Sequence, residues 1–257
     1  MITIGKHARV EPSPLVALLH PRGQGAALTL ALLAGAVWGT LATWRLGLPA
    51  WVGPALALAL LAPPLALKWR ADYMRLGAPA MVLSVLLVAQ GLHSVEHLAQ
   101  WVQFHALGWP AKAAGGLISP LNSEVVHFTW NTAVLSLVVY LIAAGMRGRW
   151  MWLLLLWAGA HSAEHVYLFG RFVAATWELR TAGLPLDGAQ GLPGLLGRGG
   201  WLAAQAASSP AAGFLCKLAP GLAEAPRLDV HFGWNAGELA LLLAAAHTAR
   251  LPGPPRA

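Results

Sequence analysis

Two short motifs, each present twice, hold most of the histidines that could do chemistry. The first, HSxEH, begins at His93 and again at His161; the second, HFxWN, begins at His127 and again at His231. Six of the ten histidines fall in these four copies. Imidazole nitrogens bind iron, copper and zinc, so the motifs predict a site for a transition metal.

Helical spacing places the chemical groups of the first motif on one face. Residues three and four apart are neighbours on an α-helix, so His93, Glu96 and His97 would present two imidazoles and a carboxylate together. Histidines at i and i+4 can bind one ion. The glutamates point to a functional site as well, because the motifs fall in segments that are predicted below to span a membrane, where an ionisable group is costly. We therefore predict eight metal ligands: His93, Glu96, His97, His127, His161, Glu164, His165 and His231.

Two asparagines, Asn131 and Asn235, follow their motif histidines by four residues. They are predicted to hydrogen-bond a ligand imidazole and fix its orientation, or alternatively to form hydrogen bonds between helices. Four other histidines (His7, His20, His105 and His247) have no counterpart in the other motif copy, and we expect none of them to be a ligand.

The ligand set favours two metal ions, because eight ligands exceed what one ion takes. Imidazole with carboxylate suits iron or copper, with zinc as a further option, whereas the single Cys216 excludes iron–sulfur and cysteine-rich zinc chemistry. The leading hypothesis is an oxygen-activating oxidoreductase, similar in chemistry to a monooxygenase or hydroxylase, acting on a hydrophobic substrate and supplied by an electron donor.

Three other interpretations stay open at this stage. The histidines could be axial ligands of haem b in an electron-transfer membrane subunit. They could form the ion site of a metal transporter or sensor. They could also serve only to join helices by hydrogen bonds, although six histidines and two glutamates repeated in pairs argue against this interpretation.

The composition shows what must position these groups. Of the 257 residues, 57% are hydrophobic and 11% charged, with a mean hydropathy of +0.59. This predicts an all-α integral membrane protein with the lipid bilayer as its main partner. The net charge of +7 comes from isolated Lys and Arg residues between apolar segments, so we expect no nucleic-acid binding. Six transmembrane helices are predicted, at about 25–44, 51–67, 79–104, 123–146, 150–177 and 228–248.

The motif order predicts a parallel internal duplication. The HSxEH copies lie 68 residues apart and the HFxWN copies 104 apart, and a long loop at about 179–227 takes up the difference. The third and fourth spans then form one hairpin (79–146), and the fifth and sixth a second (150–248). With a rise of 1.5 Å per residue, His93 and His161 lie about 21 and 17 Å above the inner boundary, and His127 and His231 about 8 Å below the outer one. All four motifs would share one layer in the outer half of the bilayer.

Loop charges predict the orientation. Lys and Arg residues concentrate in the tail at 1–24, in the loops after the second and fourth predicted spans, and in the tail at 249–257. Both termini should therefore face the cytoplasm of a multi-pass protein in the cell's inner (plasma) membrane. The first two helices (25–67) are expected to serve packing. The long outer loop is expected to contain one short amphipathic helix at about 201–215 and to act as a lid or a linker.

Overall fold

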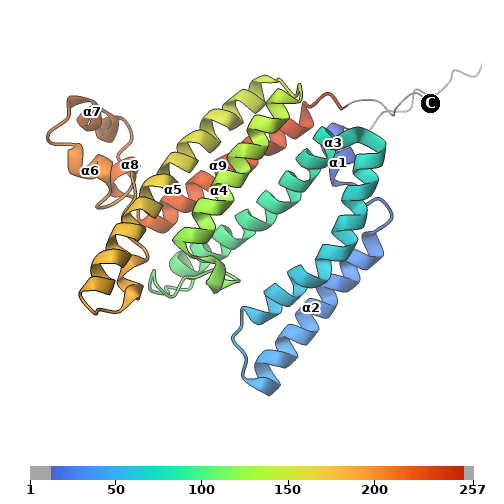
Figure 1. Cartoon of the computed structure of the whole chain (residues 1–257), viewed down its shortest axis with the longest axis horizontal. Coiled ribbons are helices and arrows are strands. Elements are labelled where there is room, and N and C mark those ends of the chain that lie inside the picture. Colours follow the sequence, from blue (N-terminus) through green and yellow to red (C-terminus); the bar gives the residue numbers. More distant parts are fainter. Residues whose placement is uncertain (1–12, 252–257) are drawn as a thin grey trace, which may run out of the picture.

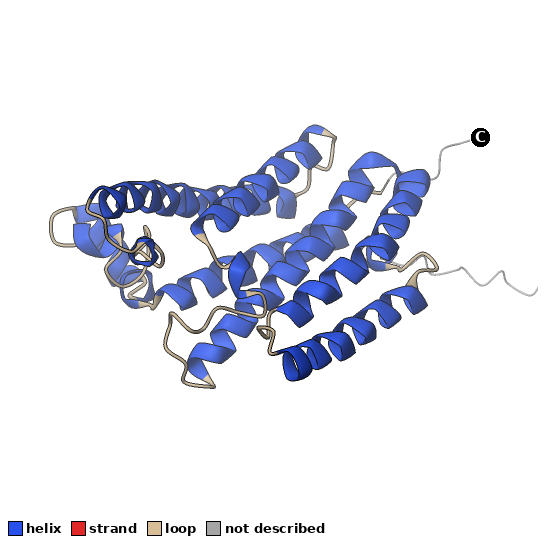
Figure 2. Cartoon of the chain, turned by 60° about the horizontal axis from the view of Figure 1, so that its bottom comes forward, coloured by secondary structure: helices blue, strands red, loops and turns tan. Residues whose placement is uncertain are grey.

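The computed structural model describes residues 13–251, which form helices joined by loops, with no strand in that range (Figure 2). This confirms the all-helical prediction. Of the tails, 1–12 and 252–257 lie outside the described residues, as do His7 and several charges used to predict the orientation. The elements in chain order are α1 (Pro14–Leu19), α2 (Gly25–Leu46), α3 (Val52–His105), η1 (Ser119–Leu121), α4 (Glu124–Ala143), α5 (Arg149–Thr181), η2 (Leu186–Ala189), α6 (Trp201–Gln205), α7 (Pro210–Leu218), α8 (Gly221–Glu224) and α9 (Arg227–His247).

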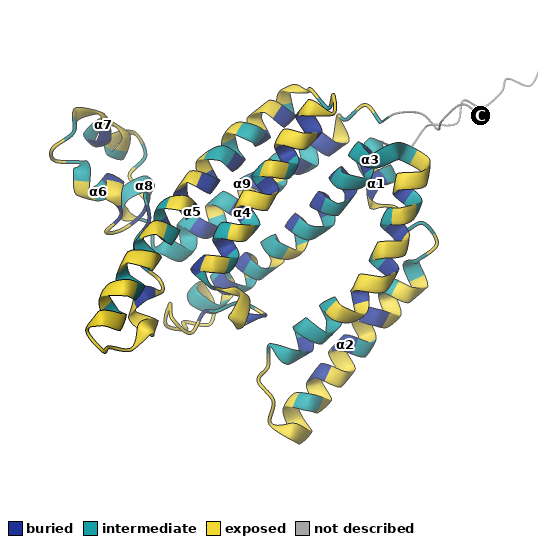
Figure 3. Ribbon diagram, in the orientation of Figure 1, coloured by how far each residue is buried: buried dark blue, intermediate teal, exposed yellow. Residues whose placement is uncertain are grey.

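Three of these helices, α2, α3 and α4, are long and apolar enough to cross a membrane. Large apolar side chains are exposed along α2, as expected of a surface that faces lipid, and Leu60 and Leu67 of α3 are exposed as well (Figure 3). Helices α5 and α9 have 33 and 21 residues, long enough to span a bilayer. Their motif residues and other polar groups lower their hydropathy, and the count of six spans and the duplication stay predictions.

Helix α3 contains both the second and the third predicted span. Its 54 residues correspond to about 81 Å of straight helix, far more than one bilayer crossing needs. The helix is broken at Gly77 (φ 81°, ψ 173°), a left-handed conformation that glycine adopts without a Cβ clash. Figure 1 shows α3 doubling back at its upper right, so that its two arms cover the ranges of the second and third predicted spans.

The helix extends beyond the predicted end of the second span. We expected this span to end at about residue 67, but the first arm of α3 continues through Lys68 as far as Gly77. Pro63 and Pro64 lie within this arm, because neighbouring helices and local adjustments can compensate for the backbone hydrogen bonds that proline removes in a membrane helix. The chain turns at Gly77, shortly before Pro79 and within the predicted connection.

Small residues hold α2 against the first arm of α3. A Cβ added at Gly39 would collide with the Cα of Gly53, and one added at Gly35 would lie 2.5 Å from the Cα of Ala57. The two backbones therefore approach closely, as in membrane helix pairs that use small residues four apart. Together these two segments form a hairpin beside the main bundle (Figure 1).

The main bundle consists of the second arm of α3 with α4, α5 and α9. Helix α4 packs on α5, α5 on α9, and α9 on α3. Leu83, Leu86, Val138, Leu154 and Leu242 belong to a buried apolar core in the half of the bundle near the end of α4 and the start of α5. We call the opposite end, where α4 and α9 begin, the histidine end.

A buried charge cluster joins α1 to α3, although the sequence predicted neither α1 nor a buried charge here. Lys68 Nζ donates to Asp72 Oδ2 (2.6 Å), to the Leu18 carbonyl (2.5 Å) and to the Ser84 hydroxyl. Arg22 Nε donates to the other oxygen of Asp72 (2.8 Å). Lys68 and Asp72 are 2% and 0% exposed, so their pairing offsets the cost of burying both charges.

The long loop after α5 is more structured than predicted. In place of one helix at about 201–215 it holds α6, α7 and α8, which lie together beside α5 and α9 in Figure 1. Ser209 separates α6 from α7, since its side chain accepts a hydrogen bond from the Ala212 N–H and caps the new helix. Pro210 then occupies the first position of α7, where no N–H is needed.

Candidate metal centre

Three histidines of the first hairpin form the tightest group of potential ligands at the histidine end. One ligand nitrogen from each of His93, His97 and His127 lies within 4.8 Å of the other two. His93 and His97 come from α3, at i and i+4, and His127 comes from the first turns of α4. This group can hold a metal ion, as the sequence predicted for this half.

The histidines of the second hairpin continue the same cluster. The ring centroids of His127 and His165 lie 5.5 Å apart, and those of His165 and His231 lie 5.1 Å apart, with the rings nearly parallel in both pairs. His161 is joined to His165, as its neighbour on α5. All six motif histidines therefore form one continuous cluster, although the second trio is less tightly gathered than the first.

The Nε2 atoms meet in matched pairs. The distance from His93 Nε2 to His97 Nε2 is 3.2 Å, and the distance from His161 Nε2 to His165 Nε2 is also 3.2 Å. Two nitrogens that bind one tetrahedral ion at the usual metal–nitrogen distance stand about 3.3 Å apart. Both pairs therefore already have the separation of two ligands of one ion.

Hydrogen bonds at Nδ1 orient three of these rings. His97 Nδ1 lies 2.9 Å from Gln100 Oε1, His127 Nδ1 lies 2.9 Å from the Ser123 carbonyl, and His161 Nδ1 lies 2.7 Å from Glu238 Oε2. Each partner is an acceptor, so the Nδ1 of each ring carries the proton and donates. In a neutral ring this leaves the Nε2 lone pair free for a metal, the usual arrangement around histidine ligands.

The two motif glutamates have other contacts. Glu96 accepts hydrogen bonds from the backbone N–H groups of Leu117 and Ile118, both at 2.9 Å. Glu164 accepts them from Leu195 (3.1 Å) and Leu196 (3.3 Å). Each carboxylate thus anchors the loop that follows its helix, and these contacts give no support to the prediction that the two glutamates are metal ligands.

Glycines make room for both carboxylates. A Cβ at Gly116 would collide with the Glu96 carboxylate, and one at Gly194 would collide with the Glu164 carboxylate. A Gly-Leu pair precedes each copy of the HFxWN motif, as Gly116-Leu117 and as Gly194-Leu195. In both pairs the glycine makes room for the carboxylate and the leucine N–H donates to it. Gln103 and Arg171, each seven residues after its glutamate, add further bonds to the same loops at Gly116 and Pro193. The loops after α3 and α5 are therefore anchored by matched contacts.

The two asparagines bind main chain rather than imidazole. Asn131 Nδ2 donates to the His127 carbonyl at 2.9 Å, and Asn235 Nδ2 donates to the His231 carbonyl at 3.0 Å. Asn235 Oδ1 also accepts from Gln90 on α3 at 3.2 Å. Asn235 therefore joins α9 to α3, whereas the side-chain bond of Asn131 stays within α4.

Two tryptophans and a glutamate that we did not predict as site residues also contact the motif imidazoles. Trp130 packs on His93, with ring centroids 4.9 Å apart, and Trp234 stacks on His161 at 5.4 Å. Glu238 lies seven residues after His231, two helical turns along the same face. That spacing was the signal that could have identified it.

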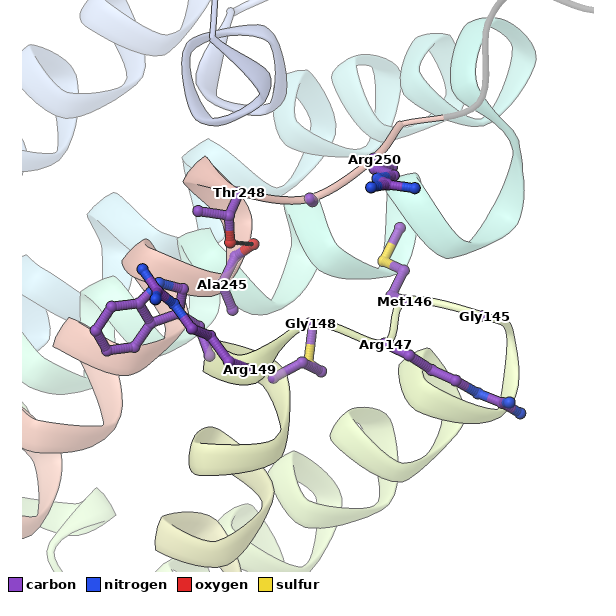
Figure 4. Close-up of a pocket in the computed structure, with 11 residues that line it drawn as sticks. Gly145, Met146, Arg147, Gly148, Arg149, Ala245, Thr248 and Arg250 are labelled. Atoms are coloured by element: carbon purple, nitrogen blue, oxygen red, sulfur yellow. Dashed lines mark hydrogen bonds between the residues drawn. The ribbon is translucent and has the colours of Figure 1, made fainter.

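The opposite end of the bundle contains a separate cavity of about 390 Å³, between the α4–α5 turn and the end of α9 (Figure 4). Its lining includes Arg147, Arg149 and Arg250. In Figure 4 the side chains of Arg147 and Arg149 point in opposite directions, so the cations do not converge on one ligand position. None of the predicted metal ligands lines this cavity.

Comparisons with protein-family models, with curated proteins and with solved structures found no match to this chain.

Proposed function

We propose that this chain is a membrane-spanning metalloprotein that uses a histidine-ligated centre to oxidise a hydrophobic substrate with dioxygen. The observation that carries the proposal is the continuous cluster of six imidazoles, with two Nε2 pairs at 3.2 Å and one trio of nitrogens within 4.8 Å. Histidines at this density exceed what helix packing needs.

The cluster suits two ions better than one. The first trio has the spacing of a single site, and His161, His165 and His231 offer a second set of nitrogens next to it. Iron and copper are the metals that combine imidazole ligation with redox chemistry, whereas zinc would support only hydrolysis or structure. The histidine centre is therefore proposed to contain two iron or two copper ions.

The ring packing favours ions over haem b. A haem with two axial histidines needs its flat macrocycle between the two imidazoles. His127, His165 and His231 instead stack on one another at 5.1 to 5.8 Å between centroids, so imidazole rings already fill the space between neighbouring helices.

The core favours a closed site over an ion pathway. Ser84 belongs to the charge cluster around Lys68, and Gln90 lies next to the histidine layer. Between them on α3, Leu86 and Leu87 are 2% and 3% exposed, which leaves an apolar layer across the route. A transporter would need polar groups or water there.

In the proposed reaction one oxygen atom of O2 enters a C–H bond of the substrate and the other leaves as water, with two electrons from an external donor and two protons. The proposal includes an inner (plasma) membrane location with both termini in the cytoplasm, which places the histidine end in the outer half of the bilayer.

The test is oxygen uptake by the metal-loaded protein in lipid nanodiscs with a chemical reductant and medium-chain alkanes or fatty acids. Substrate-dependent uptake should be present in the wild type and lost in His97→Ala, while His247→Ala, at the far end of α9, should keep it. Products are identified by mass spectrometry as hydroxylated chains. Uptake that is the same with and without substrate would contradict the oxidoreductase proposal.

A further inference from the structure

An apolar pocket of about 260 Å³ lies at the histidine end, where α5, α8, α9 and the loop before α6 meet. Figure 1 shows α8 beside α5 and the beginning of α9. The wall side chains include Trp157, Leu196, Leu222, Val230 and Trp234. The lining contains a single charged side chain, Asp229, whose carboxylate is paired with His105 at 2.6 Å.

Only one indole ring separates this pocket from the histidine cluster. Trp234 lines the pocket and also stacks on His161, with ring planes 8° apart. Trp157 packs edge-on against Trp234 at 5.0 Å, and its Nε1 donates to the Trp234 carbonyl at 2.9 Å. These contacts fix the two indole rings, so a ligand in the pocket would lie against Trp234, directly opposite His161.

The first hairpin has different residues at the positions of two residues that line this pocket. At the positions that correspond by the motif offsets, the first hairpin has Ala89 in place of Trp157 and Thr129 in place of Gly233. Trp130 packs on His93 as Trp234 packs on His161, and the Nε1 of Trp130 donates to Gln90 Oε1 on α3. The two halves thus share the histidines and differ beside them, as expected if one side receives a ligand.

We propose that this pocket binds a linear alkyl chain next to the histidine cluster. This inference rests on the proposed function, for which it names the substrate class and the binding site. The pocket is smaller than the roughly 300–1,000 Å³ of drug-sized sites, so it suits a chain segment rather than a multi-ring molecule. Its walls are apolar and aromatic apart from Asp229, whose carboxylate is already paired with His105.

Gly233 provides a way to fill the pocket without disturbing the helix. A Cβ built there meets no atom within 4 Å, so the side chain of Gly233→Leu enters the pocket space. Gly91 on α3 is an equally open helical glycine outside the pocket, so Gly91→Leu is the matched control.

The experiment is photo-crosslinking of the full chain in nanodiscs, followed by peptide mass spectrometry. One arm uses a free ten-carbon alkane with a diazirine, and the other a phosphatidylcholine with the same diazirine in one acyl chain. Labelling of peptides with Leu222 and Val230 is measured relative to Leu30 and Leu33 of α2, which are exposed to lipid. Gly233→Leu should reduce this ratio about tenfold, and Gly91→Leu should leave it unchanged.

The arm that shows the Gly233-sensitive labelling identifies the source of the chain, a free hydrophobic molecule or a membrane lipid. Equal labelling in the wild type and Gly233→Leu in both arms would overturn the pocket proposal. Metal content is measured on the same samples. Site-specific labelling without bound metal would contradict the proposed function alone, and bound metal without such labelling would contradict the pocket alone.

Discussion

His161 and Glu238 form a buried imidazole–carboxylate pair between α5 and α9, with 2.7 Å from Nδ1 to Oε2 and side chains 0% and 1% exposed. The first hairpin has Val134 at the position of Glu238, so His93, the counterpart of His161, cannot make this contact. In that hairpin it is His97 that has an oriented Nδ1, and its partner is the neutral amide of Gln100. A carboxylate at Nδ1 makes the opposite nitrogen a stronger ligand than an amide does. Two ions in this cluster would therefore occupy unequal environments.

Glu238→Gln tests this pair. The amide can still accept from Nδ1, but the negative charge that strengthens the ligand is lost, so metal affinity should fall about tenfold or more. Competition with a metal chelator of known affinity measures the change. Glu224→Gln, on the exposed surface of α8, is the control and should have no effect. An unchanged affinity in Glu238→Gln would show that the pair has no part in metal binding.

Glu164→Gln separates loop anchoring from metal ligation. As an anchor, Glu164 loses charge-assisted bonds to two backbone N–H groups, and the free energy of unfolding should fall by about 1–3 kcal/mol while bound metal stays constant. Thermal unfolding in detergent and elemental analysis of the same sample measure both quantities. Glu178→Gln, on the exposed end of α5, serves as the control. Loss of metal with little loss of stability would instead make Glu164 a ligand.

Gly194→Ala should be destabilising by about 1–3 kcal/mol, because the new methyl group takes the place of the Glu164 carboxylate. The backbone at Gly194 is not in the left-handed region, so the effect isolates the steric contact. Gly159→Ala on α5 has open space at its Cβ and should be neutral or slightly stabilising, because alanine favours helix. The midpoint of thermal unfolding measures both. Similar midpoints for the two variants would show that the anchor at Gly194 contributes little.

His165→Ala should remove metal to about the same degree as His97→Ala. His165 belongs to the second trio and also packs on His127 of the first, so it connects the two. Metal per chain, by mass spectrometry of the elements, is the measurement, with His247→Ala as a variant that should leave it unchanged. Full metal content in His165→Ala would mean that only the first trio binds.

The helical fold and the histidine layer could be predicted because both depend on regular spacing. Apolar runs of span length gave the positions of α2, α4, α5 and α9, and the repeated HSxEH and HFxWN motifs identified all six clustered histidines. The connection between the second and third predicted spans (68–78) contains the actual turn at Gly77, but the helix continues about nine residues beyond the predicted end of the second span, because Lys68 and other polar residues there remain helical.

The carboxylates could not be assigned from spacing alone. Glu96 lies on the same helical face as His93 and His97. Its side chain nevertheless reaches the loop after α3, where it accepts hydrogen bonds from the N–H groups of Leu117 and Ile118. Glu238 has no counterpart in the repeat, and its contact with His161 depends on how α9 packs on α5. Tertiary packing determined both roles.

The most direct test of the account is the metal content per chain of the purified wild type and of His97→Ala, after loading with iron or copper and removal of free ions. We predict about two ions per chain in the wild type. Most of this metal should be lost in His97→Ala and kept in His247→Ala. A wild type without stoichiometric metal, or a His97→Ala variant with undiminished metal, would contradict it.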